Sequence, residues 1–522
     1  MREYSLKLNK ALSMGLRPDP YAAKNSPYLT SSLGLRPTKY SLTAQVEVVN
    51  PFANQIYSSF PNPQLIKAHG GHFLASQTTL YDVIEDPLWG ATSIALTGKD
   101  DRSAQIVPGG MWHFVDMFKS WMMFNGSCTV FRTNIYGAFN EGEYTIVEKD
   151  MKINTGCYHH GRVLLGGFNS ANFFSTDWMS IVESLRKSNT VEIASPTAPG
   201  SNFIFWSSIG GGDLFNLFYP EFAINGILID KDVSASINQP LFLDYMRRNE
   251  CGFMPMSWKG DVLCIKSLRD RVVVYGSAGS AVLHSATNPI PTYGIDATLD
   301  VGIPDRGAVG GNDSRHLLMD TTGALWMITE RLSVQDTSEG FKRLGYEEYF
   351  QDFLGLPISI VYNPLQHEFY ISGGSPARGY VLTETGLGEL KYPVTSGFIS
   401  GNRFVGIAND DITLTGSLVT DTIDFDYAEL KTVGIVAVQG VGLEGATISA
   451  FWYNKVTKAW VQTVEYPLNG DGWARIGITA QDIRISVTVP DYRIARIDDI
   501  VIHYNISSNR SIRGLYVNQA QQ

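Results

Sequence analysis

The chain has little cysteine and no long apolar run. Its four cysteines, Cys128, Cys157, Cys251 and Cys264, lie far apart without a CxxC pair. This excludes a disulfide-rich scaffold and predicts buried thiols in a reducing compartment. No stretch reaches the length of a membrane span, and the amino terminus lacks the apolar core of a signal peptide. We therefore expect synthesis in a cytoplasm and no membrane insertion.

Positive charge and helical patterns are also scarce. Lys and Arg number 41 against 51 Asp and Glu, giving a net charge of −10, which disfavours general attraction to nucleic-acid phosphates. Long amphipathic runs are few, whereas 50 glycines and 23 prolines favour an all-β chain rich in turns. At 522 residues and 44% apolar content, the chain is long enough for two or more domains.

Motifs for catalysis, cofactors or metals are absent. The glycine run in residues 206–218 (WSSIGGGDLFNLF) lacks the lysine of a P-loop and predicts a tight turn. His69, His72, His159 and His160 could supply imidazoles, but no carboxylate lies at a recognised metal spacing beside them. The sequence therefore predicts no catalytic, cofactor-binding or metal-binding residues.

Scattered carboxylates are the remaining candidates for chemistry. In propeller glycosidases, several carboxylates meet at the central axis. Asp270, Asp320 and Glu384 are available here, but nothing in their spacing selects them. DTTGALW at residues 320–326 partly matches the turn motif that sialidase-type propellers repeat, and this partial match occurs once. NGDG at residues 469–472 has too few oxygen ligands for a calcium loop and predicts a hairpin turn.

Repeated strand patterns dominate the middle of the chain. Residues 258–284 contain three β-rich runs separated by turns, as in an antiparallel meander. Similar layouts are centred on Phe73, Trp121, Val163, Ile204, Val272, Leu317 and Phe369. Their mean interval is about 49 residues, within the range of four-stranded propeller blades. We predict a β-propeller of six to eight blades over residues 67–392, with a stack of β-sandwiches as the alternative.

The rest of the propeller region and the C-terminal region differ in the spacing of their apolar residues. Residues 177–188 and 241–249 show helical spacing and predict short helices in connections. From residue 393 to 522, alternating strands joined by short turns predict a β-sandwich. The aromatic side chains of that domain are interpreted as core, namely Phe451, Tyr453, Trp460 and Trp473.

Residues 1–66 precede the repeats and contain GLRP twice, at residues 15–18 and 34–37, with prolines throughout. This pattern predicts an extended segment that lies on its own domain or docks on a neighbouring subunit. We take docking as the working hypothesis. Removing the segment is then expected to impair assembly while leaving the thermal transition of the propeller nearly unchanged.

Several runs resemble those of tail hub or nozzle (DNA-stabilisation) proteins of short-tailed bacteriophages. They are the GLRP entry, CYHHGRVLLGGF at residues 157–168, WSSIGGGDLF at residues 206–215 and IDDIVIHY at residues 497–504. In that family a β-propeller is joined to a β-rich platform. The resemblance implies a virion protein of the tail, synthesised in the host cytoplasm, with no catalytic residues.

The same resemblance implies a homohexameric ring that contacts the portal, the adaptor and other tail proteins. Its channel retains genomic DNA and then conducts it at ejection, through transient non-specific contacts. The alternatives are a glycan-binding or glycan-cleaving β-propeller, such as a host-receptor protein or glycosidase, and a cellular propeller that serves as a scaffold for protein partners.

Overall fold

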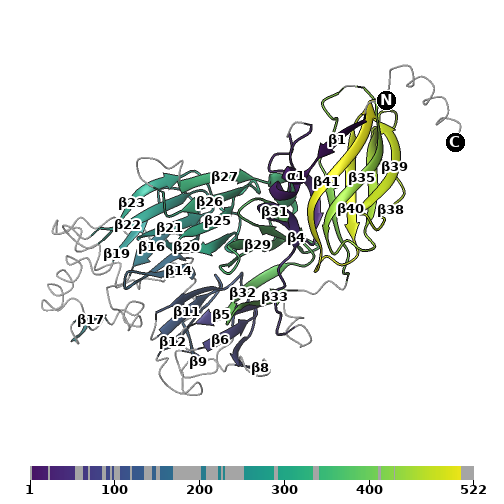
Figure 1. The fold of residues 1–522 in the computed structure, drawn as a ribbon. Coiled ribbons are helices and arrows are strands. Elements are labelled where there is room, and N and C mark those ends of the chain that lie inside the picture. The colour runs from purple at the N-terminus through teal and green to yellow at the C-terminus, as the bar shows by residue number, and fades with distance from the viewer. Residues whose placement is uncertain are drawn as a thin grey trace.

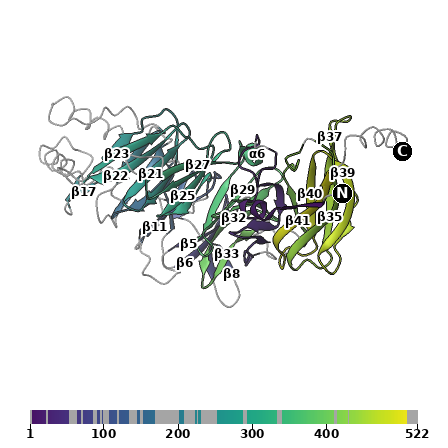
Figure 2. The same cartoon turned by 45° about the horizontal axis from the view of Figure 1, so that its top comes forward.

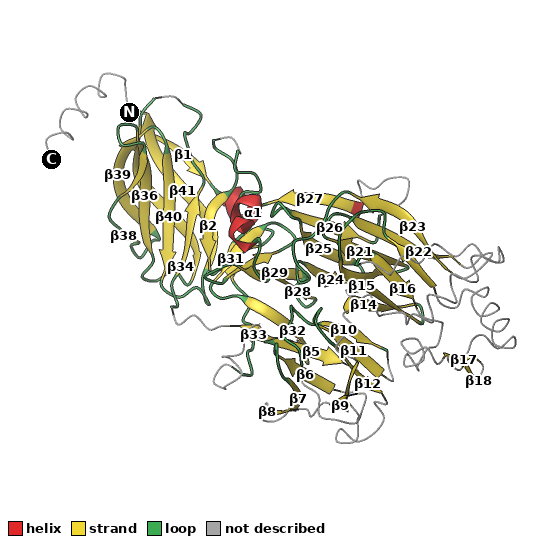
Figure 3. Ribbon diagram, turned by 180° about the vertical axis from the view of Figure 1, so that it is seen from behind, coloured by secondary structure: helices red, strands yellow, loops and turns green. Residues whose placement is uncertain are grey.

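The computed structural model describes most of the chain in segments separated by short and long gaps. These segments are residues 3–21, 24–52, 63–68, 71–84, 90–93, 97–98, 106–117, 120–133, 144–147, 153–168, 201–206, 222–224, 227–229, 252–286, 292–332, 340–408, 413–427 and 429–506. Within them the regular secondary structure is nearly all strand (Figures 1 and 3). Its described helices are the short α1 (Asn9–Met14), α6 (Glu347–Phe350) and the 3₁₀ turn η2 (Gln351–Phe353). The all-β prediction is confirmed.

Six antiparallel meanders follow one another from residue 64 to residue 390, and we number them as blades 1 to 6. Blade 1 contains β5 (Gln64–Ala68), β6 (Gly71–Ala75), β7 (Leu80–Ile84) and β8 (Gly90–Ser93). Blade 2 contains β10 (His113–Asp116), β11 (Ser120–Phe124), β12 (Thr129–Thr133) and β13 (Tyr144–Val147), with β9 (Thr97–Gly98) parallel to β13. Blade 3 contains β14 (Ile153–His159), β15 (Arg162–Phe168), β16 (Phe203–Trp206) and β19 (Gly252–Pro255).

The later blades are more regular. Blade 4 contains β20 (Val262–Leu268), β21 (Arg271–Gly276), β22 (Ser280–Ala286) and β23 (Thr292–Leu299). Blade 5 contains β24 (Val309–Asn312), β25 (Arg315–Met319), β26 (Leu325–Thr329) and β27 (Phe341–Gly345). Blade 6 contains β28 (Ser359–Asn363), β29 (Glu368–Gly373), β30 (Arg378–Leu382) and β31 (Leu387–Leu390). A separate hairpin is formed by β17 (Phe222–Ile224) and β18 (Ile227–Ile229).

A two-stranded seventh blade closes the ring. It contains β32 (Val394–Ser400) and β33 (Arg403–Ala408), and β32 packs between β28 of blade 6 and β5 of blade 1. The Leu65 N–H donates to the Ser396 hydroxyl at 2.7 Å across the closing boundary. Blades 1 and 2 are joined where the Trp112 N–H donates to Gln64 Oε1 at 2.5 Å. The first strands of the blades thus surround one axis, which confirms the predicted propeller, and the described residues form seven blades.

The repeat anchors locate six of these blades. All but one of the anchors fall in the second strand of a blade. The exception is Ile204, which lies in β16, the third strand of blade 3. It pairs with Gly166 of β15, the second strand of the same blade, which also contains the anchor Val163. Two anchors therefore mark a single blade, because second and third strands of a meander carry the same buried apolar runs. Blade 7 has no anchor, since its hairpin ends after two strands.

Blade strands and sandwich strands differ in burial for a simple reason. A propeller blade is covered on both faces by its neighbours, so β21 is buried at every position except its first residue. A sandwich sheet has one face toward solvent, so β34 (Gly416–Thr420) alternates between buried and half-buried residues. This explains why alternating apolar and polar residues become frequent after residue 393. The propeller itself extends to residue 408.

The C-terminal sandwich has two sheets. One contains β34, β36 (Thr447–Asn454), β37 (Ala459–Gln462), β38 (Tyr466–Pro467) and β40 (Ile483–Val489). The other contains β35 (Lys431–Val441), β39 (Trp473–Ala480) and β41 (Arg496–Ile506). Its core is mostly aliphatic, with Phe425, Tyr492 and Tyr504 as its buried aromatic residues. The interpretation of four other aromatic residues as core is wrong. Each of them is half-buried, namely Phe451, Tyr453, Trp460 and Trp473.

The N-terminal segment is built into both domains, which corrects its prediction as a separate extended segment. β1 (Glu3–Lys7) and β4 (Leu42–Ala44) pair with β41, and β3 (Leu35–Pro37) pairs with β4. β2 (Leu29–Leu33) pairs with β31 on one side and β34 on the other. Figure 3 shows β2 and β31 at this joint, with α1 beside them. Docking on a partner stays a prediction.

The domain limits shift accordingly. The propeller covers residues 64–408 rather than 67–392, and the sandwich comprises residues 416–506 together with N-terminal strands. Blade 6 lies between the other blades and the sandwich (Figure 2). The predicted helices at residues 177–188 and 241–249, and residues 207–218 of the glycine run, lie outside the described residues.

Candidate functional site

A cavity of about 620 Å³ opens on the propeller axis. It is lined by the first strands of blades 2, 3 and 4 and, in blade 5, by the end of β24, the turn that follows it and His316 of β25. Its volume falls in the range of small-molecule sites. Charged side chains reach it from three blades: Asp116 ends β10, Lys266 lies within β20, and Asp313 follows β24. These residues are far apart in sequence and meet only through ring closure.

The loop before blade 5 joins blades across the axis. The Asp305 carboxylate accepts from the Ile358 N–H of blade 6 at 3.3 Å, and the Gly307 carbonyl accepts from the Ile360 N–H at 3.1 Å. From the same loop, Arg306 Nη2 donates to the Phe124 carbonyl of blade 2 at 2.8 Å. Residues 305–308 therefore tie opposite parts of the ring together, and the propeller axis is not an open passage.

Arg306 is a buried charge. Its side chain is almost fully enclosed, and Nε and Nη1 have no hydrogen-bond partner among the described residues. Burial lowers the pKa of Arg306 to about 10, so the guanidinium remains charged at neutral pH. A buried charge with one protein partner makes this loop sensitive to substitution.

Three histidines bridge neighbouring blades by the same arrangement. Nε2 of His159 lies 3.1 Å from the Arg269 carbonyl, and Nε2 of His316 lies 2.9 Å from the Ser267 carbonyl. A carbonyl only accepts, so Nε2 carries the proton and Nδ1 is an acceptor. Nδ1 then receives a hydroxyl proton, from Tyr293 for His159 and from Tyr275 for His316. These tyrosine contacts are 3.0 Å and 2.7 Å long.

His113 repeats this arrangement on the other side of the cavity. Its Nε2 donates to the Arg306 carbonyl at 3.0 Å, and its Nδ1 accepts from the Thr155 hydroxyl at 2.9 Å. Thr155 in turn accepts the Ile265 N–H at 2.9 Å. Blades 2 to 5 are thus cross-linked around the cavity by neutral imidazoles.

These bridges predict a loss of stability in mild acid. Burial lowers the pKa of His159 to about 4 and that of His316 to about 3. Because both values lie below the unfolded value of about 6.5, stability is complete above that pH and falls as the pH drops toward the folded values. We expect a loss of about 2 kcal/mol per histidine between pH 7 and pH 5. Urea unfolding across this range measures it.

The matched variants for this prediction are His159→Gln and His316→Gln. Glutamine keeps a donor for the carbonyl and an acceptor for the tyrosine but does not titrate. The double variant should therefore unfold with a flatter pH dependence than the native chain between pH 7 and pH 5. An unchanged slope in the double variant would contradict the assignment.

The carboxylates that the sequence made available, without selecting any of them, do not line the cavity. Asp270 lies in an exposed turn, and Glu384 is exposed near Arg315. Asp320 is buried and caps its own turn: it accepts from the Thr322 and Ala324 N–H groups and from the Trp326 indole at 2.8 to 2.9 Å. The partial sialidase-type motif thus has a structural role here.

Sequence reasoning missed the charged residues that do line the cavity. Asp116 and Asp313 each stand at the end of a blade's first strand, and Lys266 is the one charged residue in the otherwise uncharged run VLCIKSL. The available signal was a charged residue within the first strand of a blade. This signal can be used only when the order of strands within each blade is known.

The predicted absence of a metal site stays a prediction. No group of three His, Cys, Asp or Glu that could hold a metal ion occurs among the described residues. His72 stacks on Phe398 between blades 1 and 7, with ring centroids 4.6 Å apart, whereas His159 and His160 stack on each other in blade 3. His69 lies outside the described residues.

The three described cysteines are free buried thiols, namely Cys128, Cys157 and Cys264. Burial raises the pKa of each, which keeps them protonated and unreactive. Cys251 lies outside the described residues. In the part of the chain that is described, no helix is long and apolar enough to cross a membrane.

The two GLRP repeats hold opposite ends of β31. In each repeat the glycine has a positive φ, 66° at Gly15 and 76° at Gly34. An added Cβ at Gly15 would lie 2.4 Å from the Leu387 carbonyl oxygen. The Leu16 N–H donates to this Leu387 oxygen at 2.8 Å, and the Gly34 N–H donates to the Glu389 carbonyl at the same distance. The repeats therefore fix blade 6 to the N-terminal segment.

The arginines of the repeats extend this joint. Arg17 forms a bidentate pair with Glu348, at 2.8 and 3.1 Å, and lies 3.5 Å from Asp421 at the end of β34. Arg36 pairs with the buried Glu368 of β29. Each arginine thus joins the N-terminal segment to the propeller, and Arg17 also reaches the sandwich.

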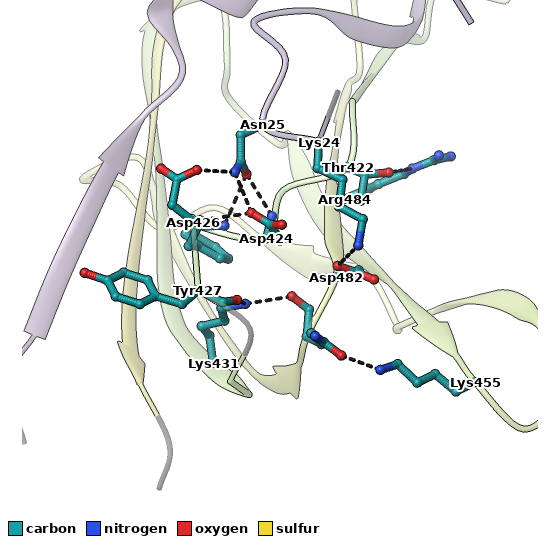
Figure 4. A network of polar contacts seen from close by, with 12 residues as sticks. Lys24, Asn25, Thr422, Asp424, Asp426, Tyr427, Lys431, Lys455, Asp482 and Arg484 are labelled. Atoms are coloured by element: carbon teal, nitrogen blue, oxygen red, sulfur yellow. Dashed lines mark hydrogen bonds and ion pairs between the residues drawn. The ribbon is translucent and has the colours of Figure 1, made fainter. Parts of the chain in front are cut away.

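A polar network continues the joint into the sandwich (Figure 4). Asn25 donates to Asp426 at 2.7 Å and accepts the Asp424 N–H at 2.8 Å, while Lys24 pairs with Asp482 at 2.8 Å. The fully buried Lys431 donates to the Gln481 carbonyl at 3.0 Å. Asn25 is therefore anchored to the loop between β34 and β35, and Lys24 to the turn between β39 and β40.

Comparisons with known proteins add little to this description. No protein-family model and no curated protein matches the chain. Among solved structures, an exo-β-1,3-galactanase from Phanerochaete chrysosporium aligns at 7% identity over 78% of this chain and 98% of its own, with a TM-score of 0.28. Kluyveromyces lactis Hsv2 aligns at 8% identity over 63% and 98%, also with a TM-score of 0.28.

PorZ, a bacterial surface component of the type-IX secretion system of Porphyromonas gingivalis, aligns at 9% identity and a TM-score of 0.27. The alignment covers 68% of this chain and 41% of PorZ. TM-scores this low carry no conclusion about function. The class defined by the fold itself is a seven-bladed β-propeller joined to a β-sandwich by its own N-terminal segment.

Proposed function

We propose that this chain is a structural subunit of a short-tailed phage tail, of the hub or nozzle kind, which assembles into a ring of six copies. The observation that carries the proposal is the rigid coupling of its two domains. One sheet runs from β28 of blade 6 through β2 to β37 of the sandwich. A subunit that must keep its shape in a tail under internal pressure needs such a joint.

The shared core supports the same conclusion. One cluster of buried apolar side chains includes Leu317 of blade 5, Phe350 beside blade 6, Leu16 of the N-terminal segment and Ile485 of the sandwich. Bending between the domains would expose part of this cluster to water, which is unfavourable. The domains therefore behave as one body.

The closed propeller axis determines where DNA would pass. Because residues 305–308 tie blades 2 and 6 together across the axis, a DNA channel has to form between subunits and not through a propeller. Six copies at −10 each carry about −60 in total, and acidic surfaces on a channel wall would repel phosphates and allow DNA to slide. The subunit needs no catalytic step for this role.

The proposal predicts concentration-dependent rings. In sedimentation velocity and negative-stain microscopy, the full chain should form sixfold rings with a central channel at high protein concentration, or when portal and adaptor from the same genome are added. The rings should be built from the intact full-length chain, and their assembly should require no ligand. A chain that stays monomeric under both conditions, or that hydrolyses glycans as a monomer, would contradict the proposal and favour the glycosidase alternative.

A further inference from the structure

Among the residues that the structure describes, Lys266 is the one lysine or arginine that lines the axial cavity. Lys266 lines the cavity from β20 and is half-buried. Burial is the main cause of the low pKa of His113 and of His316, and the Lys266 charge lowers both further. These histidines belong to blades 2 and 5, so the ammonium acts on both sides of blade 4. It lies where the inner strands converge.

The Lys266 ammonium has no hydrogen bond or ion pair with any residue that the structure describes. A possible carboxylate partner, Asp313, instead accepts a hydrogen bond from Ser267. A half-buried ammonium gains most from a charged acceptor, because a charge-assisted hydrogen bond is stronger in a partly desolvated site than in water. The Lys266 ammonium therefore favours an anionic group beside it.

The rest of the lining limits what that anion can be. Asp116 and Asp313 border the same cavity, and their negative charge disfavours ligands with several anionic groups. Both carboxylates accept hydrogen bonds from hydroxyl groups. Phe114 and Tyr158 add aromatic faces on blades 2 and 3, which suit the apolar face of a ring.

We propose that the axial cavity binds a sugar acid, meaning a pyranose ring that carries a single carboxylate. The carboxylate binds Lys266, the ring hydroxyls donate to Asp116 and Asp313, and the ring lies against Phe114 and Tyr158. The cavity of about 620 Å³ accommodates one or two such rings. Its open end leaves room for the rest of a glycan chain.

This site does not depend on ring assembly, because every residue that forms it belongs to one propeller. A failure of the chain to form rings would leave the sugar-acid site intact. A failure to bind sugar acids would likewise leave the tail proposal standing. The two proposals are therefore tested separately.

The direct test is titration calorimetry of the full chain with D-glucuronate and with N-acetylneuraminate. Glucose, N-acetylglucosamine and the methyl ester of glucuronate serve as neutral probes, and acetate, inorganic phosphate and alanine as probes without a sugar ring. We expect at least one sugar acid to bind about tenfold or more tightly than its neutral counterpart. The ester comparison uses the native chain and needs no variant.

The variants locate the site. Lys266→Met should weaken binding of the sugar acid about tenfold or more and leave the melting temperature nearly unchanged. Lys266→Gln is a second, polar replacement in case methionine perturbs the strand. Lys259→Met is the matched control, because Lys259 is exposed, precedes the same strand and does not line the cavity.

Each of the following results would overturn the proposal. They are the absence of sugar-acid binding at millimolar concentration, equal affinity for glucuronate and its methyl ester, and unchanged affinity in both folded Lys266 variants. Binding of acetate, phosphate or alanine as tightly as of the sugar acid would also refute it, since charge alone would then explain the affinity.

Discussion

Deletion of residues 1–44 is expected to prevent stable folding of the sandwich and to destabilise blade 6. The segment contributes five leucines with no exposed surface, which are Leu12, Leu16, Leu29, Leu35 and Leu42. Burial of such side chains contributes about 2 kcal/mol each, or about 10 kcal/mol together. That is comparable with the whole unfolding free energy of a domain. Thermal unfolding followed by circular dichroism, together with the soluble yield, measures the effect.

This expectation reverses the one drawn from sequence, in which the segment could be removed with little change in melting temperature. The deletion also exposes the edges of β31, β34 and β41, which pair with the segment. Exposed edges favour aggregation. A truncated chain that stays soluble and melts within a few degrees of the full chain would refute the structural assignment.

Point variants separate the role of burial from that of chain length. Leu29→Ala should cost about 3 kcal/mol, because it leaves a cavity between blade 6 and the sandwich. Tyr21→Ala is the control within the same segment, since Tyr21 is 92% exposed. It should change stability by less than about 0.5 kcal/mol.

Gly307→Ala is expected to destabilise the propeller by about 3 kcal/mol. A Cβ at this position would lie 1.9 Å from the Ile358 carbonyl oxygen and 2.3 Å from Met111 Sδ. Methionine can move, but the carbonyl belongs to the backbone before β28, so the loop that joins blades 2 and 6 would have to shift. Urea unfolding of the full chain, followed by tryptophan fluorescence, measures the loss.

Gly434→Ala is the matched control for this substitution. Gly434 lies in β35, and a Cβ there would meet no atom within 4 Å. We expect a change within about 0.5 kcal/mol. Equal stability of the two alanine variants would show that the loop of residues 305–308 is not packed as described.

Local patterns explain how much of the fold was predictable. Runs such as β21, which are apolar at nearly every position, indicated strands covered on both faces, and the alternation in β34 indicated one covered face. Turns between them separated the strands, so the meanders could be counted approximately. The interval did not distinguish a second strand from a third, as Ile204 shows, because both carry the same apolar pattern.

The candidate site was much less predictable. Asp116, Lys266 and Asp313 are separated by up to about 200 positions, and no local rule connects residues that meet through ring closure. The carboxylates that were considered from sequence lie elsewhere: Asp320 caps its own turn, and Asp270 lies in solvent. Charge within a strand was the informative feature, and Lys266 displays it.

The sequence by itself determined the class of secondary structure, the meander as repeating unit and the change from propeller strands to sandwich strands. It did so because side-chain alternation and turn chemistry act over a few residues. Only the tertiary structure decided the seven blades, the axial cavity and the position of the N-terminal segment. The repeated GLRP motif illustrates the division: its glycines and prolines indicated two turns, but its partners Leu387 and Glu389 lie more than 350 residues away. Long-range pairing depends on which edges remain free when the whole chain has folded, and no local pattern records it.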